Sequence, residues 1–573
     1  MNLSPLAIAG IALGAILIIL ILVILFRTFS FPIQRDKAAP IALPEVDGKS
    51  VAERIGLAVQ YKTIADPDPA KIDGYPFEGM HRMLRMLYPQ VHEKLTLETV
   101  NQYSLLYTWE GNNPDLEPIL FMAHQDVVPA DESADSGWTH PPFSGELADG
   151  YVWGRGTLDI KNSLISLFEA VTFLLKEGFK PERTIYLAFG HDEEVSGIHG
   201  AKAIAELLES RGVRLSFLLD EGGSVMQGNL PGIEQPVALI GISEKGYLSL
   251  KLNSRVAGGH SSMPPENTAI GMLALSVAAL EANPFPAHLD VVQFMMSYLG
   301  NAVPFTQRVA LANSWLFGGM LKRKLAASHT TNASLRTTTA PTLFHAGVKE
   351  NVLPAEAEAV VNFRIFPGDT LRDVYESVVD LVGDEHITVS PVGSETLESD
   401  YGWNPTPVVD TESPQFERLL NLVEAAFPEA LAAPFLVLGA TDARHYARIC
   451  ENAFRFSPVL ITKEDLGGTH GVNEHLSFEN AACMVGFYIE CMREMGSLST
   501  DIERQVLVEE IETKVPVEEI ELPVYEPEKV EEEAQAVIKT RPAPKKRKPA
   551  KSDILLPDLP PEEELVVKPL KKE

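Results

Sequence analysis

The sequence is poor in cysteine and in positive charge. Its 573 residues include three cysteines, Cys450, Cys483 and Cys491, which is too few for a disulfide framework, and no Cys-x-x-Cys pair suggests a thiolate metal site. Lysine and arginine number 48 against 79 aspartates and glutamates, so the formal net charge is −31. Such an acidic chain repels phosphate backbones, which argues against nucleic acid as a partner. The cysteine content leaves the cellular compartment open.

Charged residues are absent from the apolar stretch at residues 5–26, PLAIAGIALGAILIILILVILF. About 20 apolar residues suffice to cross a bilayer, so we expect a single-pass transmembrane helix here, followed by a linker at residues 27–48. A cleaved signal peptide is the alternative, but it would have a basic segment first and a shorter apolar run. Arg27, Arg35 and Lys37 follow the span, and these few charges would place the body on the cytoplasmic side.

The other end of the chain, residues 498–573, has no hydrophobic periodicity. An acidic stretch punctuated by proline is followed by the basic run RPAPKKRKPAK. Segments of this kind bury too little apolar surface to offset the entropy of ordering, so we expect a disordered tail. The basic run would suit contact with anionic lipid or a nuclear signal.

Strands and helices alternate through the body of the chain. Apolar, strand-like runs at 118–126, 184–194 and 215–223 are separated by helical patterns at 162–179 and 200–212. This alternation predicts an α/β fold with a largely parallel sheet and helices on both faces. We assign residues 49–246 to the first part of this domain and residues 397–497 to its second part.

The intervening residues 247–396 follow the order β-α-β-β-α-β, which is typical of a ferredoxin-like α+β unit. We therefore expect a second domain inserted into the first. Within it, residues 285–341 form a further insertion that the pattern does not place.

Acidic and imidazole side chains stand at the ends of three successive predicted strands. They are His124 and Asp126, Glu193 and Glu194, and Asp220 and Glu221. Ligands of open α/β sheets bind at the carboxyl ends of the strands, so these side chains are candidates for one site.

His124 and Asp126 lie two positions apart and would share one face of the strand. His124 can bind a metal through one ring nitrogen while Asp126 orients the ring through the other. A buried histidine–aspartate hydrogen bond without metal would give the same pair.

The adjacent carboxylates of Glu193 and Glu194 repel each other unless a cation lies between them. A divalent metal would let Glu194 act as ligand and Glu193 take a proton from the bound water, whereas a solvated acidic loop is the alternative. Asp159, in the glycine-rich WGRGTLDIKN, could be a ligand or a helix N-cap. His470, in THGVNEH, is a weak signal on its own.

Imidazoles and carboxylates without thiolates suit Zn²⁺, with Mn²⁺ or Co²⁺ as possible substitutes. Two metals bridged by one carboxylate, about 3.5–4 Å apart, would activate a water molecule.

Six motifs occur in this order: HQDVVP, GRGTLDIKN, HDEEVSG, DEGG, GGHSSMPP and THGVNE. The chain thereby resembles, over residues 49–495, the aminoacylase/carboxypeptidase family of dizinc exopeptidases. The resemblance is strongest to the carboxypeptidase S branch, which includes N-acyl-amino-acid amidohydrolases.

The resemblance implies the roles of the site residues. His124 would bind one zinc and His470 the other, with Asp159 bridging both, Glu194 on the zinc of His470 and Glu193 as general base. Asp126 would orient His124. The fifth ligand would be Asp220 or Glu221, which point to opposite faces, and we favour Asp220. A cis peptide bond would join Asp159 to Ile160.

The inserted domain is a lid in similar enzymes. The resemblance implies that His260 reaches the scissile carbonyl of the substrate, often from the other subunit of a homodimer. Asn351 and Arg364 would bind the substrate carboxylate. The expected activity is hydrolysis of the amide bond of short peptides or of N-acyl amino acids, and the motifs do not separate the two. Because amide hydrolysis is reversible, synthesis of N-acyl amino acids is conceivable. The rival hypothesis is an inactive, membrane-tethered interaction protein, against which the intact ligands and base argue.

Overall fold

The N-terminal apolar stretch forms one long helix. The computed structural model describes residues 4–33, 35–228, 230 and 232–497, so the tail expected at residues 498–573 lies outside the described part. Helix α1 spans Pro5–Phe29 and is capped by the side chain of Ser4. It is long and apolar enough to cross a membrane, and its most apolar stretch is not buried against the rest of the protein. The helix continues three residues beyond the predicted span, through Arg27 to Phe29.

The segment after α1 is fastened to the rest of the protein. Arg35 forms an ion pair with Glu424 at 2.6 Å, and Lys37 Nζ donates to the carbonyl oxygens of Pro428 and Ala430. The part of the expected linker around Arg35 and Lys37 therefore contacts α13 (Pro414–Ala426) and the residues that follow it.

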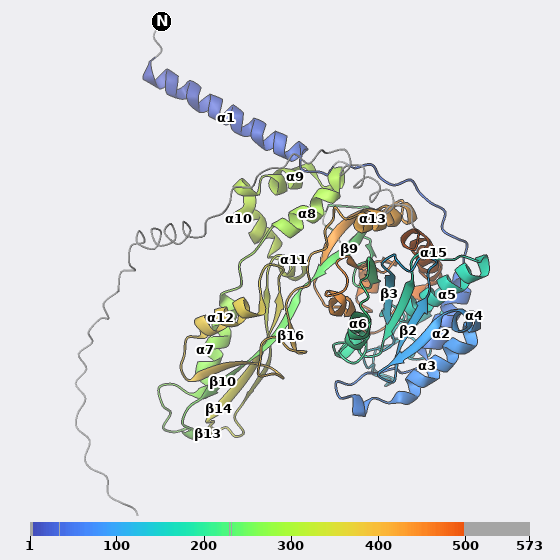
Figure 1. The fold of residues 1–573 in the computed structure, drawn as a ribbon. Helices are drawn as coiled ribbons and strands as arrows, with labels where there is room; N and C mark the ends of the chain where they lie inside the picture. Colours follow the sequence, from blue (N-terminus) through green and yellow to red (C-terminus); the bar gives the residue numbers. More distant parts are fainter. Residues whose placement is uncertain (1–3, 34, 229, 231, 498–573) are drawn as a thin grey trace, which may run out of the picture. The chain divides into compact units, whose positions relative to one another are not determined.

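The larger sheet has ten strands and is parallel at its centre (Figure 1). Strand β3 pairs in parallel with β6 and β7, and β7 with β18, whereas β1–β2, β2–β6 and β18–β9 are antiparallel. The prediction of an α/β fold with a largely parallel sheet is confirmed. The strands are β1 (Thr96–Val100), β2 (Ser104–Trp109), β3 (Ile119–His124), β6 (Ile185–Gly190), β7 (Phe217–Asp220), β8 (Val225–Met226), β9 (Val237–Glu244), β17 (Leu431–Val437), β18 (Ala453–Arg455) and β19 (Leu460–Ile461).

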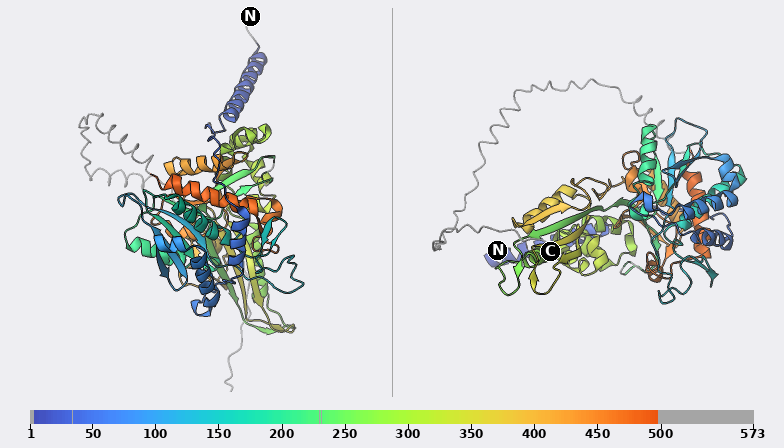
Figure 2. Two further views of the ribbon diagram at one scale, coloured as in Figure 1. Left: turned by 90° about the vertical axis from the view of Figure 1, so that its right-hand side faces the viewer. Right: turned by 90° about the horizontal axis from the view of Figure 1, so that it is seen from below.

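Helices cover both faces of this sheet (Figures 1 and 2). Side chains alternate along β3, so Ile119 and Phe121 join the core beneath one set of helices, while Leu120 and Met122 join the core on the other face. The first face carries α2 (Gly48–Val59), α5 (Lys161–Glu177), α13 and α15 (Phe478–Met495), and the second carries α6 (Ala201–Ser210). Helices α3 (Gly74–Leu87) and α4 (Pro89–Lys94) pack into the first core.

A second sheet follows directly after β9. Its elements run in the expected order: β10 (Gly246–Arg255), α7 (Ala269–Ala282), β12 (Thr338–Ala346), β14 (Glu356–Ile365), α12 (Leu371–Val382) and β15 (Ile387–Pro391). The strand order in the sheet is β12-β14-β10-β15, and the neighbouring strands are antiparallel. Leu273 of α7 and Val374 of α12 pack with Leu250 and Phe363 in a separate core.

Residues 285–341, which the sequence left unplaced, contain a small helical cluster. Its helices are α8 (Asp290–Tyr298), α9 (Phe305–Ala312), α10 (Ser314–Leu325) and α11 (His329–Ala333). Val292 and Leu311 share a core with Leu239 of β9 and Ala433 of β17, and Phe31 packs against it. The cluster therefore joins the edge of the large sheet to the chain that leaves α1.

Candidate catalytic metal centre

One carboxylate lies between two imidazoles. Asp159 Oδ1 is 3.0 Å from His124 Nε2, and Asp159 Oδ2 is 3.0 Å from His470 Nε2. The two histidines come from distant parts of the chain, since His124 ends β3 and His470 lies in the loop before β20 (His475–Ser477). Asp159 stands in the loop before α5, and the expected cis peptide bond between Asp159 and Ile160 is present.

Each imidazole also faces a second carboxylate. Glu221 Oε1 is 3.2 Å from His124 Nε2, and Glu194 Oε2 is 3.2 Å from His470 Nε2. The expectation for Asp220 does not fit this geometry, because its Oδ2 accepts the backbone N–H of Ala443 at 2.8 Å. Asp220 is the last residue of β7, so its side chain and that of Glu221 point to opposite faces, and the residue after the strand faces the site.

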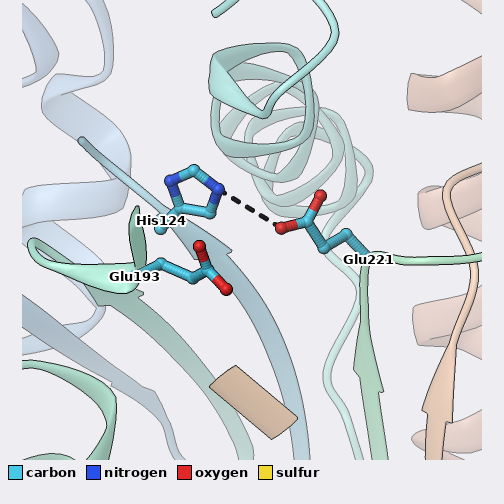
Figure 3. Close-up of side chains that lie close together, drawn as sticks. All are labelled: His124, Glu193 and Glu221. Atoms are coloured by element: carbon cyan, nitrogen blue, oxygen red, sulfur yellow. Dashed lines mark ion pairs between the residues drawn. The ribbon is translucent and has the colours of Figure 1, made fainter. Parts of the chain in front are cut away.

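Glu193 lies beside the first imidazole. Its carboxylate, His124 and Glu221 offer ligand atoms that all lie within 4.8 Å of one another (Figure 3). Removal from solvent raises the pKa of Glu193 well above its usual range, and the nearby carboxylates of Asp442 and Glu221 add to this. A carboxylate with a raised pKa is a stronger base than one in water.

Asp126 holds this corner of the site in place. Its two carboxylate oxygens accept the backbone N–H groups of Glu193 at 3.1 Å and Glu194 at 3.0 Å. The backbone carbonyl of Asp126 lies 2.9 Å from His124 Nδ1, closer than the carboxylate at 3.4 Å. A proton on Nδ1 donated to that carbonyl leaves the Nε2 lone pair directed at Asp159 and Glu221.

The donor set fits two divalent cations that share Asp159. Two groups of metal-ligating side chains overlap at His124, one with Glu193 and Glu221 and one with Asp159 and Glu194. Burial raises the pKa of Glu221 to about 8, and the buried Glu194 Oε1 has no hydrogen-bond partner among the described residues. Positive charge between these groups would relieve the repulsion and use the unpartnered oxygen.

The sequence analysis did not identify Glu474, which shapes the Asp159 loop. This fully buried side chain accepts the backbone N–H groups of Gly156 at 2.9 Å, Leu158 at 2.7 Å and Asp159 at 3.2 Å through Oε1. Its other oxygen pairs with Arg155 at 2.7 Å. The glutamate stands four residues after His470, inside the quoted motif THGVNEH, but its backbone partners could not be inferred from the sequence.

A second overlooked group is Arg444, in the short 3-10 helix η4 (Asp442–Tyr446) that follows β17. Its guanidinium lies 4.4 Å from the ring of Trp403, and that ring stacks on Tyr247. Arg364 lies over Tyr247 at 4.9 Å, so two guanidinium groups flank one aromatic pair. Burial lowers the pKa of Arg364, with smaller influences from Tyr247, Arg444 and Glu193.

The other two residues expected in the lid lie elsewhere. His260 and Asn351 are exposed, and they stand at the short ladder of β11 (Gly259–His260) and β13 (Val352–Leu353). The His260 ring contacts Ser262 Oγ at 2.7 Å. The described contacts therefore bring Arg364, but not His260 or Asn351, into the neighbourhood of Glu193.

Comparison with known proteins identifies the family of this chain. Residues 120–494 match the profile of peptidase family M20/M25/M40. The chain belongs to this family. It is 37% identical over 488 residues to the probable carboxypeptidase S-like 2 of Dictyostelium discoideum, covering 83% of this chain and 92% of that protein. It is 38% identical over 487 residues to the N-fatty-acyl-amino acid synthase/hydrolase PM20D1 of Xenopus tropicalis, covering 83% and 93%.

A more distant relative is carboxypeptidase S of Saccharomyces cerevisiae, which is 31% identical over 483 residues and covers 77% of this chain and 83% of that protein. An M20 family metallo-carboxypeptidase from Sulfolobus solfataricus has the same fold, with a TM-score of 0.56, 15% identity and coverage of 78% and 99%. The M20 protein described here is thus a metallo-hydrolase with the M20 peptidase fold.

Proposed function

We propose that this M20 protein is a zinc-dependent hydrolase that cleaves the amide bond of short peptides or N-acyl amino acids and is anchored in a membrane by α1. The observation that carries the proposal is the Asp159 carboxylate shared between His124 and His470, with Glu193 beside it. An inactive scaffold is disfavoured because a full set of ligands and a base is retained. The three basic residues that follow the span, Arg27, Arg35 and Lys37, favour a cytoplasmic location for the rest of the protein, because basic residues next to a span tend to stay on that side.

His124, Glu221 and one oxygen of Asp159 would hold the first zinc. His470, Glu194 and the other oxygen of Asp159 would hold the second. Such a metal pair acidifies a water molecule and stabilises negative charge on the carbonyl oxygen. We therefore replace Asp220 by Glu221 in the ligand set.

Glu193 is the proposed general base. Its carboxylate would take a proton from the attacking water and return it to the nitrogen of the leaving amine. Asp126 would keep Glu193 in position, because both carboxylate oxygens of Asp126 are committed to the backbone of Glu193 and Glu194.

The substrate's own carboxylate would bind at Arg364, with Arg444 close by. A guanidinium donates two parallel hydrogen bonds to a carboxylate, and the aromatic pair Tyr247–Trp403 holds both groups in place. His260 is exposed, which suits a role at the active site of a second copy, so we propose a homodimer formed through the inserted domain, with Asn351 in the same interface.

Two substrate classes remain, and a relative at 38% identity named for N-fatty-acyl amino acids favours the second. A panel run on the purified full-length protein separates them: dipeptides, N-acyl amino acids of rising chain length, and the same compounds with the carboxylate amidated. We expect hydrolysis of free-carboxylate substrates only, and condensation of fatty acid with amino acid at high product concentration. If the protein binds two zinc ions per chain but cleaves no compound of this panel, the proposal is refuted.

A further inference from the structure

We propose that the outer faces of α9 and α10 form a membrane-docking surface that lies in the headgroup region of an anionic bilayer, beside the foot of α1. This docking surface consists of Phe305, Trp315, Leu316, Met320 and the basic cluster Lys322–Lys324. The inference rests on the proposed anchoring by α1 and adds a second, peripheral contact with lipid.

The foot of α1 is built into this helical cluster (Figure 1). Arg27 Nε donates to the carbonyl oxygen of Ala312 at 3.0 Å, and Asn313 Nδ2 donates to Thr28 Oγ1 at 3.2 Å. The ring of Phe29 lies 6.1 Å from that of Phe305, and Thr28 is fully buried. The junction of α9 and α10 is therefore fixed to the last turn of α1.

This attachment sets the height of the docking surface. The charge-free stretch ends at Phe26, and Arg27 marks the point at which the chain reaches the polar edge of the bilayer. Because Ala312 and Asn313 bond to this turn, α9 and α10 lie at the level of the headgroups.

The surface offers the side chains that this region prefers. Trp315 and Met320 are each 56% exposed, Leu316 47% and Phe305 46%. Aromatic side chains favour the membrane–water interface, and apolar side chains on a surface helix bury themselves among the acyl chains there. Four exposed apolar side chains on two helices that contact each other are unfavourable in water and favourable in a membrane interface.

The charge of the segment selects the lipid. Residues 285–341 contain five basic residues, Arg308, Lys322, Arg323, Lys324 and Arg336, against a single acidic one, Asp290. This segment is therefore positively charged, although the whole chain carries a net charge of −31. Three of the five lie in the last turn of α10, next to the apolar side chains. Anionic headgroups attract such a cluster.

The test uses tryptophan quenching in the full-length protein. The protein is reconstituted into vesicles of phosphatidylcholine with one part in five of phosphatidylserine, and brominated phosphatidylcholine serves as the quencher. We expect a quenched component of the emission that disappears in Trp315→Phe. The charge variant Lys322→Gln/Arg323→Gln/Lys324→Gln should lose most of that component. Lys251→Gln, which alters a half-buried lysine of the inserted domain, should keep it.

Flotation of the protein with the same vesicles measures membrane attachment through α1 separately. Hydrolysis of substrate measures whether the active site is intact. Protein that floats but shows no Trp315-dependent quenching overturns the docking surface and leaves the anchor intact. Protein that does not float overturns both. Shielding of Trp315 that depends on protein concentration and not on brominated lipid would assign the surface to a second copy, and would likewise refute the proposal.

Discussion

The carboxylate of Glu474 accepts the backbone N–H of Asp159 at 3.2 Å, although 315 residues separate the two in the chain. The same oxygen takes two further N–H groups, from Gly156 and Leu158. Glu474 thereby fixes the loop that presents Asp159 to both histidines. Burial raises its pKa to about 7, which reflects how little solvent reaches it.

Glu474→Gln should impair the centre without touching a ligand. The amide retains one acceptor oxygen but loses the ion pair with Arg155, so Asp159 is held less firmly. We expect metal affinity and kcat/KM to fall by about 10–100-fold, the usual cost of removing a group that orients a ligand. Metal titration and kinetics at saturating zinc check this, and excess zinc should restore part of the activity. Full activity without added zinc would show that Glu474 serves only stability.

Glu193→Gln should separate chemistry from metal binding. The amide keeps the shape of the side chain but accepts no proton, so kcat should fall by about 10²–10⁴-fold. Metal analysis should still find two zinc ions per chain, because the base is not needed as a ligand. The control is Glu194→Gln, which should lose metal as well as activity. Activity within a few-fold of normal in Glu193→Gln would remove it as the base.

Asp220 and Glu221 provide a matched pair of neighbouring carboxylates. Glu221→Gln removes a charged group 3.2 Å from His124 Nε2 and should lower zinc occupancy at that site. Asp220→Asn should keep zinc, since the asparagine oxygen can still accept from Ala443, and should change the thermal midpoint more than the metal content. Zinc content by mass spectrometry and thermal unfolding distinguish the two variants. The reverse pattern would reinstate the assignment made from sequence.

Metal binding should release protons. Without metal, the hydrogen bonds that the His470 ring donates to Asp159 and Glu194 raise the pKa of His470 to about 10. Burial opposes charge on His124, but hydrogen bonds to Asp126, Asp159 and Glu221 hold its pKa well above the usual range. Both imidazoles are then protonated at pH 7 and must become neutral to ligate. Glu221, whose pKa is about 8, must also give up its proton, so roughly three protons should leave when the site fills.

The sign of the pH dependence follows from these raised pKa values. Zinc affinity should be weak at pH 6 and should rise towards pH 9, as deprotonation of the imidazoles becomes less costly. Calorimetry of the metal-free protein in buffers of different ionisation enthalpy measures the proton count. An affinity independent of pH across this range would mean that the imidazoles are not ligands.

The elements of the site were predictable because they follow from local patterns. Strand periodicity placed His124, Glu193 and the Asp220–Glu221 pair at strand ends, and the carboxyl ends of parallel strands meet at one edge. The choice within the last pair was not predictable, because it depends on whether the strand ends at Asp220 or one residue later. A shift of one residue changes the face to which a side chain points.

Other features depend on contacts between distant residues. Glu474 acts by accepting hydrogen bonds from backbone N–H groups, and a pattern of side chains in the sequence does not show such bonds. The helices at residues 285–341 have weak patterns of their own, and their position follows from Arg27, Asn313 and Leu239, which belong to three separate parts of the chain. Sequence periodicity describes single elements and carries little information about such partners.

The placement of His470 has a consequence for how the enzyme matures. His124, Asp159 and Glu194 are present once the first third of the chain has been made, but the second imidazole arrives only near the end of translation. A nascent polypeptide would therefore carry only one of the two imidazoles of the centre until the ribosome has translated both sheets. We therefore expect hydrolysis only from chains whose body is complete.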